Sequence, residues 1–324
     1  MVSTLYENRI DPDLTAPWVD QLNVMIEHEL VSDLKISASY VYKDWKNSMS
    51  DRLYDLSTGR YWNTYERAPE FWVPFTTTIP AYGDIPAQTV KMYFLSKNSP
   101  EQVTRLTKIP EAKRRYQALE FSFNKRMSRG WQMGGSVVLS SLKGNYSVDA
   151  SGYVWDAAFN TPNWYINRDG NLESSRPLYI KLFGSYTLPW DFVASFFYLH
   201  ASGTPWQRTL TVYPPAAWAA ANNVRSDAFS INVEPLGSRR NEASDNLDLR
   251  IEKQFRIGDR GRLAAYVDIF NVLGTSMLEV STNPGGTWRP ADANTTEGVY
   301  SPDWMGITNF IGARTFEFSV RFWF

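Results

Sequence analysis

The sequence predicts an all-β protein and, within that class, a transmembrane antiparallel β-barrel. Three observations support this fold class. Stretches of strand length alternate apolar and polar residues, as expected for strands that face lipid on one side and water or protein on the other. The connections between these stretches are either very short or very long, as in barrels with periplasmic turns and extracellular loops. Aromatic residues make up 15% of the chain, although its mean hydropathy is only −0.37.

Composition excludes several classes of function. The formal net charge is −1 and the charges are scattered along the chain, so nucleic acid is not an expected partner. Cysteine is absent, which removes disulfides, thiolate metal sites and a cysteine nucleophile, and we expect no cofactor and no metal. No apolar run approaches the roughly 20 residues of a spanning helix. Residues 1–7 lack the features of a signal peptide, so any export signal is expected outside this sequence.

The first hairpin follows a predicted loop at residues 1–20, which is rich in proline and aspartate. Residues 21–30 alternate apolar and polar side chains, residues 32–33 form a turn, and residues 34–43 alternate again. His28 lies on the apolar face near the end of its strand, where we expect it at an interface.

Three further pairs of alternating stretches predict hairpins. They are residues 118–124 with 131–140 across 128–130, 178–188 with 192–202 across 189–191, and 247–257 with 263–269 across 258–261. Their polar faces carry charges, which are costly in a soluble core but fit a wet or plugged barrel lumen. The predicted lumen-facing residues, including two from the last strand, are Glu120, Asp248, Arg250, Glu252, Asp268, Glu317 and Arg321.

Residues 314–324 predict the last strand, which ends on an aromatic carboxy-terminus. Its apolar face consists of Phe316, Phe318, Val320, Phe322 and Phe324. The chain then makes about nine spanning strands, each near the roughly 9 to 11 residues that crossing requires. If the short turns are periplasmic, the first strand begins outside the cell and the last ends in the periplasm. Because bacterial single-chain barrels have even strand numbers, we expect at least one strand before residue 1.

Four long connections, predicted to be extracellular loops, separate the hairpins at residues 44–115, 144–176, 203–244 and 274–313. The first holds a predicted ribbon of residues 72–79 and 89–95. Flat aromatic faces in these loops could stack on sugars or engage peptides, although several could instead belong to the aromatic girdle at the lipid interface. The candidate ligand-binding residues are Trp62, Trp72, Trp155, Trp164, Trp206, Trp218, Trp288 and Trp304.

Several segments carry a family resemblance. They are NLDLRIEKQF at 246–255, GRL at 261–263, DIFNVL at 268–273, DPDL at 11–14 with Ala16-Pro17, FNKR at 123–126, GWQ at 130–132 and RFWF at 321–324. Together they resemble the carboxy-terminal barrel of TonB-dependent outer-membrane receptors, especially the large group with a carboxypeptidase-regulatory-like amino-terminal domain. The resemblance covers nearly the whole chain in the expected order.

This resemblance implies a barrel of about 22 strands around a plug, with energy delivered by TonB. The expected partners are outer-membrane lipid, the barrel-assembly machinery and a missing amino-terminal barrel and plug portion, on the same or a separate chain. TonB would act only through that missing portion. The resemblance also implies that the apolar residues of the last strand serve as an assembly signal in addition to contacting lipid.

The expected function is uptake of a bulky solute by the full receptor. A structural or partner-binding barrel without transport is the main alternative, and a soluble carbohydrate-binding β-protein is a weaker one. We expect no enzyme, although His200 lies near Ser195, Ser202 and Asp191 in the sequence and could belong to a hydrolase. Residues 167–171 superficially resemble a calcium loop, but the glutamate that an EF-hand requires is absent.

Overall fold

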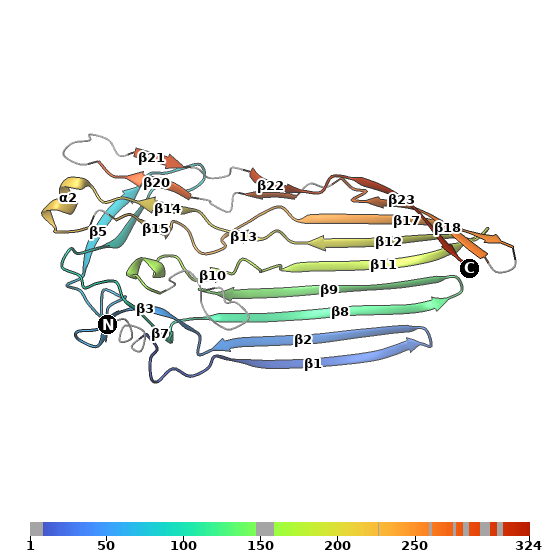
Figure 1. Ribbon diagram of the computed structural model, residues 1–324, viewed down its shortest axis with the longest axis horizontal. Coiled ribbons are helices and arrows are strands. Elements are labelled where there is room, and N and C mark those ends of the chain that lie inside the picture. Colours follow the sequence, from blue (N-terminus) through green and yellow to red (C-terminus); the bar gives the residue numbers. More distant parts are fainter. Residues whose placement is uncertain are drawn as a thin grey trace.

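The computed structural model describes residues 9–146, 159–225, 227–258, 261–274, 277–280, 285–291, 299–302 and 307–324. In these residues nine long strands form one antiparallel sheet in chain order, and each is hydrogen-bonded to the next (Figure 1). They are β1 (Trp18–Val31), β2 (Leu34–Lys46), β8 (Arg114–Ser128), β9 (Trp131–Gly144), β11 (Leu178–Leu188), β12 (Phe192–Ala201), β17 (Ser244–Ile257), β18 (Gly261–Phe270) and β23 (Thr315–Trp323).

The four predicted hairpins and the terminal strand are confirmed. The ends of several strands differ, because backbone pairing continues beyond the residues with clear alternation. β1, for example, begins at Trp18, inside the predicted loop, since Trp18 pairs with Lys46 at the end of β2. The terminal strand pairs with β18, with Arg262 opposite Trp323.

Short turns join the long strands at one end of the sheet, as Figure 1 shows. The turn between β8 and β9 contains Arg129 and Gly130, whose φ angles are +50° and +80°. Two consecutive residues with positive φ match the twist of a two-residue hairpin. The predicted asymmetry between short turns and long connections is therefore confirmed.

The long connections are more ordered than the sequence indicated. We call the described residues of 47–113, 145–177, 202–243 and 271–314 the loop assembly; it lies at the end of the sheet opposite the short turns (Figure 1). The predicted ribbon is present as β5 (Trp72–Ile79) and β6 (Gln88–Leu95). The remaining elements are β3 (Met49–Asp55), β4 (Arg60–Tyr61), β7 (Thr104–Lys108), η1 (Pro162–Tyr165), β10 (Gly170–Asn171), β13 (Pro205–Trp206), β14 (Thr209–Val212), α2 (Ala216–Ala221), β15 (Phe229–Asn232), β16 (Arg239–Arg240), β19 (Met277–Val280), β20 (Gly285–Arg289), β21 (Val299–Pro302) and β22 (Ile307–Ile311).

The buried apolar clusters of the described residues lie mainly in the loop assembly. The largest packs β5 and β6 against β14, β15 and β20, through residues such as Phe94, Leu210 and Ile231. A second surrounds Trp62 and Trp72, and a third surrounds Phe159. The long strands thus present a broad sheet, and the loop assembly packs like a small globular domain beside it.

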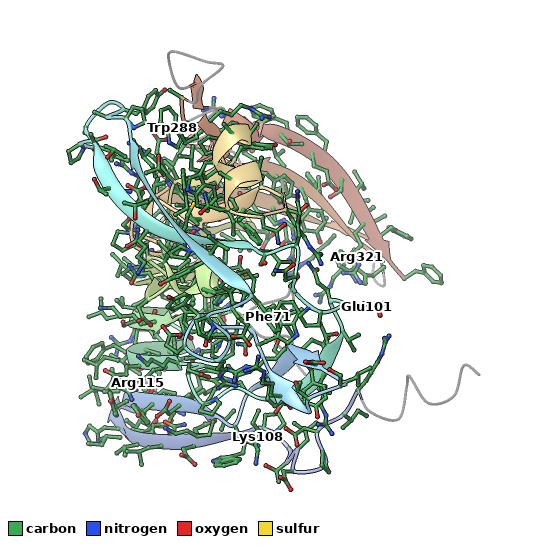
Figure 2. The ribbon with its side chains drawn as sticks, turned by 90° about the vertical axis from the view of Figure 1, so that its left-hand side faces the viewer. Phe71, Glu101, Lys108, Arg115, Trp288 and Arg321 are labelled. Atoms are coloured by element: carbon green, nitrogen blue, oxygen red, sulfur yellow. The ribbon has the colours of Figure 1, made fainter. Side chains whose placement is uncertain are left out.

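The sheet is curved, as Figure 2 shows in a view from the loop-assembly end. Within the described residues, β1 pairs with β2 alone and β23 with β18 alone, so both outer edges of the sheet are unpaired. This arrangement fits part of a barrel wall. The helical segments of the described chain, α2 and η1, are only a few residues long, and none of that chain forms a membrane-spanning helix.

Candidate functional site

An exposed apolar face is the dominant surface of the sheet. The register aligns Ile26, Ala38, Phe121, Val137 and Ile180 in one row across five neighbouring strands. A second row runs through Phe196, Leu249, Ile269 and Phe316 on the remaining strands. We call this side the outer face and the opposite side the inner face. A contiguous apolar surface of this extent requires an apolar partner or solvent.

The terminal strand continues the outer face to the edge of the sheet. Phe318 is 76% exposed and Phe324 is fully exposed, and Phe316, Val320 and Phe322 are exposed on the same side. The rings of Phe322 and Phe324 stack, with centroids 6.0 Å apart. These side chains are available to lipid or to an assembly factor, and their role as an assembly signal stays a prediction.

Polar side chains on the inner face make ordered contacts between strands. Arg250 of β17 donates from Nε and Nη2 to the two carboxylate oxygens of Asp268 on β18, at 2.5 and 2.9 Å. Asp248 accepts hydrogen bonds from the backbone N–H of Asn271, at 2.8 Å, and from the side chain of Asn246, at 3.1 Å. The charges of the fourth hairpin thus tie β17, β18 and the segment after β18 together.

The other predicted lumen-facing residues also lie on the inner face. Glu120 accepts a hydrogen bond from Ser39 at 3.5 Å, and Glu252 accepts one from Gln254 at 2.7 Å. Glu317 is the register partner of Asp268. The Arg321 guanidinium lies 5.3 Å from the Trp323 ring, and Figure 2 places Arg321 on the concave side of the sheet.

The inner face is not uniformly polar, and residues 196–199 of β12 break the alternation. Phe183 and Phe197 are register partners on this face, and both are exposed. The Phe183 ring covers Gly134, where an added Cβ would come within 2.5 Å of the ring. Glycine at residue 134 therefore makes room for an aromatic side chain inside the curve of the sheet.

Three of the eight candidate ligand-binding tryptophans are buried in the loop assembly, which corrects the expectation from sequence for these three. Trp62 and Trp72 are 0% and 1% exposed, so neither ring offers a face to a ligand. The Trp72 indole N–H donates to the Trp62 carbonyl at 2.7 Å. Trp288 is buried in the largest cluster, where its indole N–H donates to Thr77 at 2.9 Å. The long connections pack against one another and bury these rings, a tertiary effect without a local sequence signal.

Trp164, Trp206 and Trp218, the other candidates within the described residues, are partly covered. Trp218 packs on the largest cluster, with its ring centroid 4.7 Å from that of Phe75. Arg168 lies 3.4 Å from the Trp164 ring centroid, and Arg239 lies 5.8 Å from that of Trp206. Trp155 and Trp304 lie outside the described residues.

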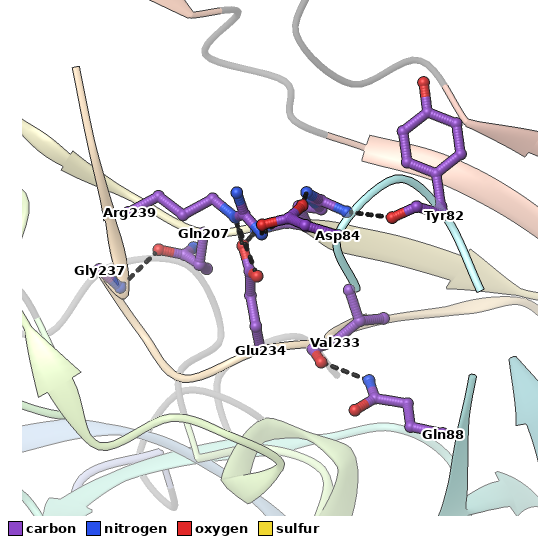
Figure 3. Close-up of polar contacts among 9 residues, drawn as sticks. Tyr82, Asp84, Gln88, Gln207, Val233, Glu234, Gly237 and Arg239 are labelled. Carbon is purple, nitrogen blue, oxygen red and sulfur yellow. Dashed lines mark hydrogen bonds and ion pairs between the residues drawn. The ribbon is translucent and has the colours of Figure 1, made fainter. Parts of the chain in front are cut away.

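A polar network holds the tip of the β5–β6 ribbon (Figure 3). Asp84 in the ribbon turn accepts hydrogen bonds from Arg208 at 2.8 Å and from Arg239 at 3.2 Å. These two arginines hold the pKa of Asp84 below its usual range. Glu234 accepts from the Arg239 guanidinium at 2.8 Å and from the Arg208 backbone N–H at 2.9 Å. The network therefore connects the ribbon to residues 202–243.

Asp55 at the end of β3 provides a pH-sensitive contact in the loop assembly. Its carboxylate accepts hydrogen bonds from the hydroxyl of Thr58, at 2.6 Å, and from the hydroxyl and backbone N–H of Ser57, at 2.7 and 2.8 Å. These bonds lower the pKa of Asp55 from 3.8 to about 2.

Because the folded-state pKa is depressed, Asp55 stabilises the fold above about pH 4, and this contribution is lost as the pH falls to about 2. We expect Asp55→Asn to unfold at lower temperature than the wild type at pH 7, with the difference shrinking between pH 4 and 2. Tryptophan fluorescence during heating measures the unfolding temperature of both proteins at each pH. Glu101→Gln, at an exposed carboxylate of the same assembly, is the matched control. Equal pH dependence for Asp55→Asn and the wild type would contradict the assignment.

The residues suggested for a hydrolase do not form a triad. His200 contacts Asp245, with Nδ1 2.9 Å from Oδ1, and Asp245 also accepts a hydrogen bond from the Tyr198 hydroxyl at 2.6 Å. Asp191 lies at the other end of β12, roughly 30 Å away at the usual rise of a strand. Ser195 has the opposite strand parity to His200 and faces the other side of the sheet.

Metal-binding geometry is not found in the described part of the chain, where no three His, Asp or Glu side chains are grouped to hold an ion. In the 167–171 segment, the side chain of Asn167 donates to the Asn232 carbonyl at 2.9 Å, and that of Asn171 donates to the Gly237 carbonyl at 3.0 Å. Both amides thus anchor neighbouring connections.

Comparison with known proteins gives distant structural matches. No family model and no curated protein matches the chain. The outer-membrane transporter YddB from Escherichia coli is 14% identical, with a TM-score of 0.44, and the match covers 95% of this chain and 33% of that one. The ferripyoverdine receptor of the Pseudomonas aeruginosa outer membrane, solved with ferripyoverdine, is 14% identical, with a TM-score of 0.42, and the match covers 95% and 27%. The chain thus spans a third or less of the length of these proteins.

Proposed function

We propose that this chain is the carboxy-terminal wall of an outer-membrane β-barrel of the TonB-dependent receptor type. In the complete protein, this wall and its loop assembly would take part in the uptake of a bulky solute. The observation that carries the proposal is the sheet of nine long strands in the described residues, which is apolar on its outer face and has short turns at one end only. A lipid bilayer is the apolar solvent that suits such a face.

Strand length supports the membrane assignment. The long strands contain 9 to 15 residues, and a tilted strand needs about 9 to 11 residues to cross a bilayer. In a membrane every backbone polar group must be paired, so β1 and β23 require further strands at their free edges. We propose that the missing amino-terminal barrel portion supplies these strands and a plug, and that TonB acts only through that portion.

The inner face supports a lumen filled by water or a plug. Its paired charges, such as Arg250 with Asp268, are suited to a polar surrounding rather than to lipid. Outer-membrane lipid and the barrel-assembly machinery are the other proposed partners, the latter through the exposed phenylalanines of β23.

A partner-binding barrel without transport is the second candidate. The buried clusters of the loop assembly favour it, because a rigid extracellular surface suits the recognition of a macromolecule. The gene upstream distinguishes the two: a plug and a TonB box in frame support uptake, and their absence from the gene and its neighbours supports partner binding. A soluble carbohydrate-binding protein would have to cover the outer face in another way, and solubility of the full protein without detergent would favour it.

Cysteine labelling tests the membrane orientation, since the natural chain has no cysteine and therefore gives no background. We expect a membrane-impermeant maleimide to label Ala87→Cys, an exposed residue before β6, on intact cells. We expect Ser32→Cys, in the short turn between β1 and β2, to react only after permeabilisation. Equal labelling of both variants on intact cells, or the reverse pattern, would overturn the proposed orientation.

A further inference from the structure

A basic groove lies at the loop-assembly end of β1, β2, β8 and β9. Its volume is about 1120 Å³, and its walls include Trp18, Trp45, Arg115 and Lys143. Arg115 and Lys143 are register partners on the outer face, and Figure 2 places Arg115 on the outer side of the curved sheet. Most strand residues of the lining, such as Asp44, lie on the side of the sheet that carries the exposed apolar rows. Trp45 and Arg114 have the opposite strand parity and lie on the inner face.

Positive charge dominates the groove. Its lining contains two carboxylates, Asp44 and Asp169, and six basic side chains, which are Lys46, Lys108, Lys113, Arg114, Arg115 and Lys143. Asp20 faces Asp44 from β1, and the excess stays positive when it is included. The whole chain has a formal net charge of −1, so this concentration of cations is a local feature.

Some of these cations are held by close contacts within the groove, whereas Lys113 is largely exposed to solvent. Asp44 accepts from Lys46 at 2.6 Å and lies 3.5 Å from Arg115. The Arg114 guanidinium lies 4.9 Å from the Trp45 ring centroid. The side chain of Lys113 is 70% exposed, and its contact with Asp169 is long, at 4.0 Å. Several lysine and arginine side chains that line one groove can bind more than one anionic oxygen of the same group.

A second, apolar groove lies farther along β1, β2, β8 and β9, toward the short turns. It has a volume of about 360 Å³ and is lined by side chains of the outer face that include Ile26, Ala38, Phe121 and Val137. Along β8, Arg115 and Phe121 are six residues apart, which corresponds to roughly 20 Å of strand. That separation is comparable to the length of a fatty-acyl chain below its headgroup.

We propose that the two grooves form one site for a membrane lipid that carries phosphate on its headgroup, in the leaflet next to the loop assembly. The basic groove would bind the phosphate, the apolar groove would receive an acyl chain, and Trp18 would lie at the polar–apolar boundary, where tryptophan is enriched. This assignment rests on the proposed membrane function. The position of both grooves on the outer face of the same strands favours a lipid over a free phosphate ion, which would make no contact with the apolar groove.

Lipid binding by the full chain, purified in neutral detergent, tests this proposal. Native mass spectrometry would compare binding of phosphatidylglycerol, a phosphodiester lipid, with that of zwitterionic phosphatidylcholine. We expect a preference for phosphatidylglycerol, and we expect the double variant Arg115→Gln, Lys143→Gln to bind it about 30-fold more weakly, on the usual contribution of two basic residues at an anionic surface. The matched control is Lys91→Gln with Lys97→Gln, which removes two exposed charges from the loop assembly.

A second variant tests the apolar groove separately. Ala38→Phe would fill it, and we expect weaker binding of long-chain phosphatidylglycerol with unchanged binding of a dihexanoyl form. Inorganic phosphate distinguishes a lipid headgroup from a free phosphate ion as the source of the anion. The lipid assignment would be overturned if millimolar inorganic phosphate displaced phosphatidylglycerol and if the double glutamine variant lost phosphate binding to the same extent as lipid binding.

Other outcomes separate this proposal from the membrane function. If the protein inserts into bilayers but shows no preference for the anionic lipid, or if the control variant loses as much binding as the groove variant, the lipid site is wrong and the barrel wall stands. If the chain is soluble without detergent and remains outside bilayers, the proposed function fails first.

Discussion

Replacing Val320 with arginine is expected to reduce assembly in the outer membrane far more than the same replacement at the adjacent Ser319. Val320 lies on the outer face near the middle of β23 and is 69% exposed. On the proposed orientation its side chain contacts lipid, and an arginine near the bilayer midplane costs about 2–4 kcal/mol in a barrel. Ser319 points to the inner face, opposite Tyr266 of β18. An arginine there would meet water or protein and the nearby polar side chains.

The measurement is the fraction of protein recovered in the outer membrane in a folded, protease-resistant form, followed by the free energy of unfolding in bilayers. Both variants add the same side chain to the same strand, so strand propensity and net charge are matched. If Val320→Arg and Ser319→Arg assemble equally well, the two faces meet the same solvent and the membrane assignment is wrong.

Replacing Trp62 with alanine is expected to destabilise the loop assembly by about 3–5 kcal/mol, the usual cost of removing a large buried aromatic side chain. Trp62 is 0% exposed, and its ring lies 5.7 Å from Phe71 and 5.9 Å from Trp72. Its loss would leave a cavity beneath β5 and β6. Denaturant unfolding followed by tryptophan fluorescence, together with limited proteolysis of the loops, would measure the effect.

Trp190→Ala is the control for this experiment, because Trp190 is 82% exposed in the turn between β11 and β12, at the other end of the sheet. We expect it to change the unfolding of the loop assembly by less than about 0.5 kcal/mol. A ligand-binding role for Trp62 predicts the opposite result, namely wild-type stability with reduced ligand binding. That outcome would return Trp62 to the list of recognition residues.

The inner and outer faces of the long strands could be read from the sequence because their signal is local. In a strand, neighbouring side chains point to opposite sides, so the alternation around Phe316 and Phe318 already separates one face from the other. Short turns such as 189–191 join strands that are adjacent in the chain, and this sets their register within a few residues. Arg250 and Asp268 fell on the predicted face for this reason, although their bidentate contact required the pairing of β17 with β18.

The packing of the loop assembly could not be predicted in the same way. β14 and β20 pair in parallel although they are far apart in the chain, and each has only four or five residues. Segments this short carry little periodicity. The burial of Trp62, Trp72 and Trp288 depends on how four separate connections pack together.

The sequence by itself determined an all-β chain, its nine long strands, the sides of those strands and the end at which the short turns gather. All of these follow from the two-residue period of a strand and from turns closed by neighbouring residues. Only the tertiary structure decided which aromatic residues are core and which are surface, and it alone brought Arg115, Lys143 and Lys46 around one groove. Those contacts join residues from separate strands and connections. Their energies depend on packing in three dimensions, which cannot be predicted from the order of residues along the chain.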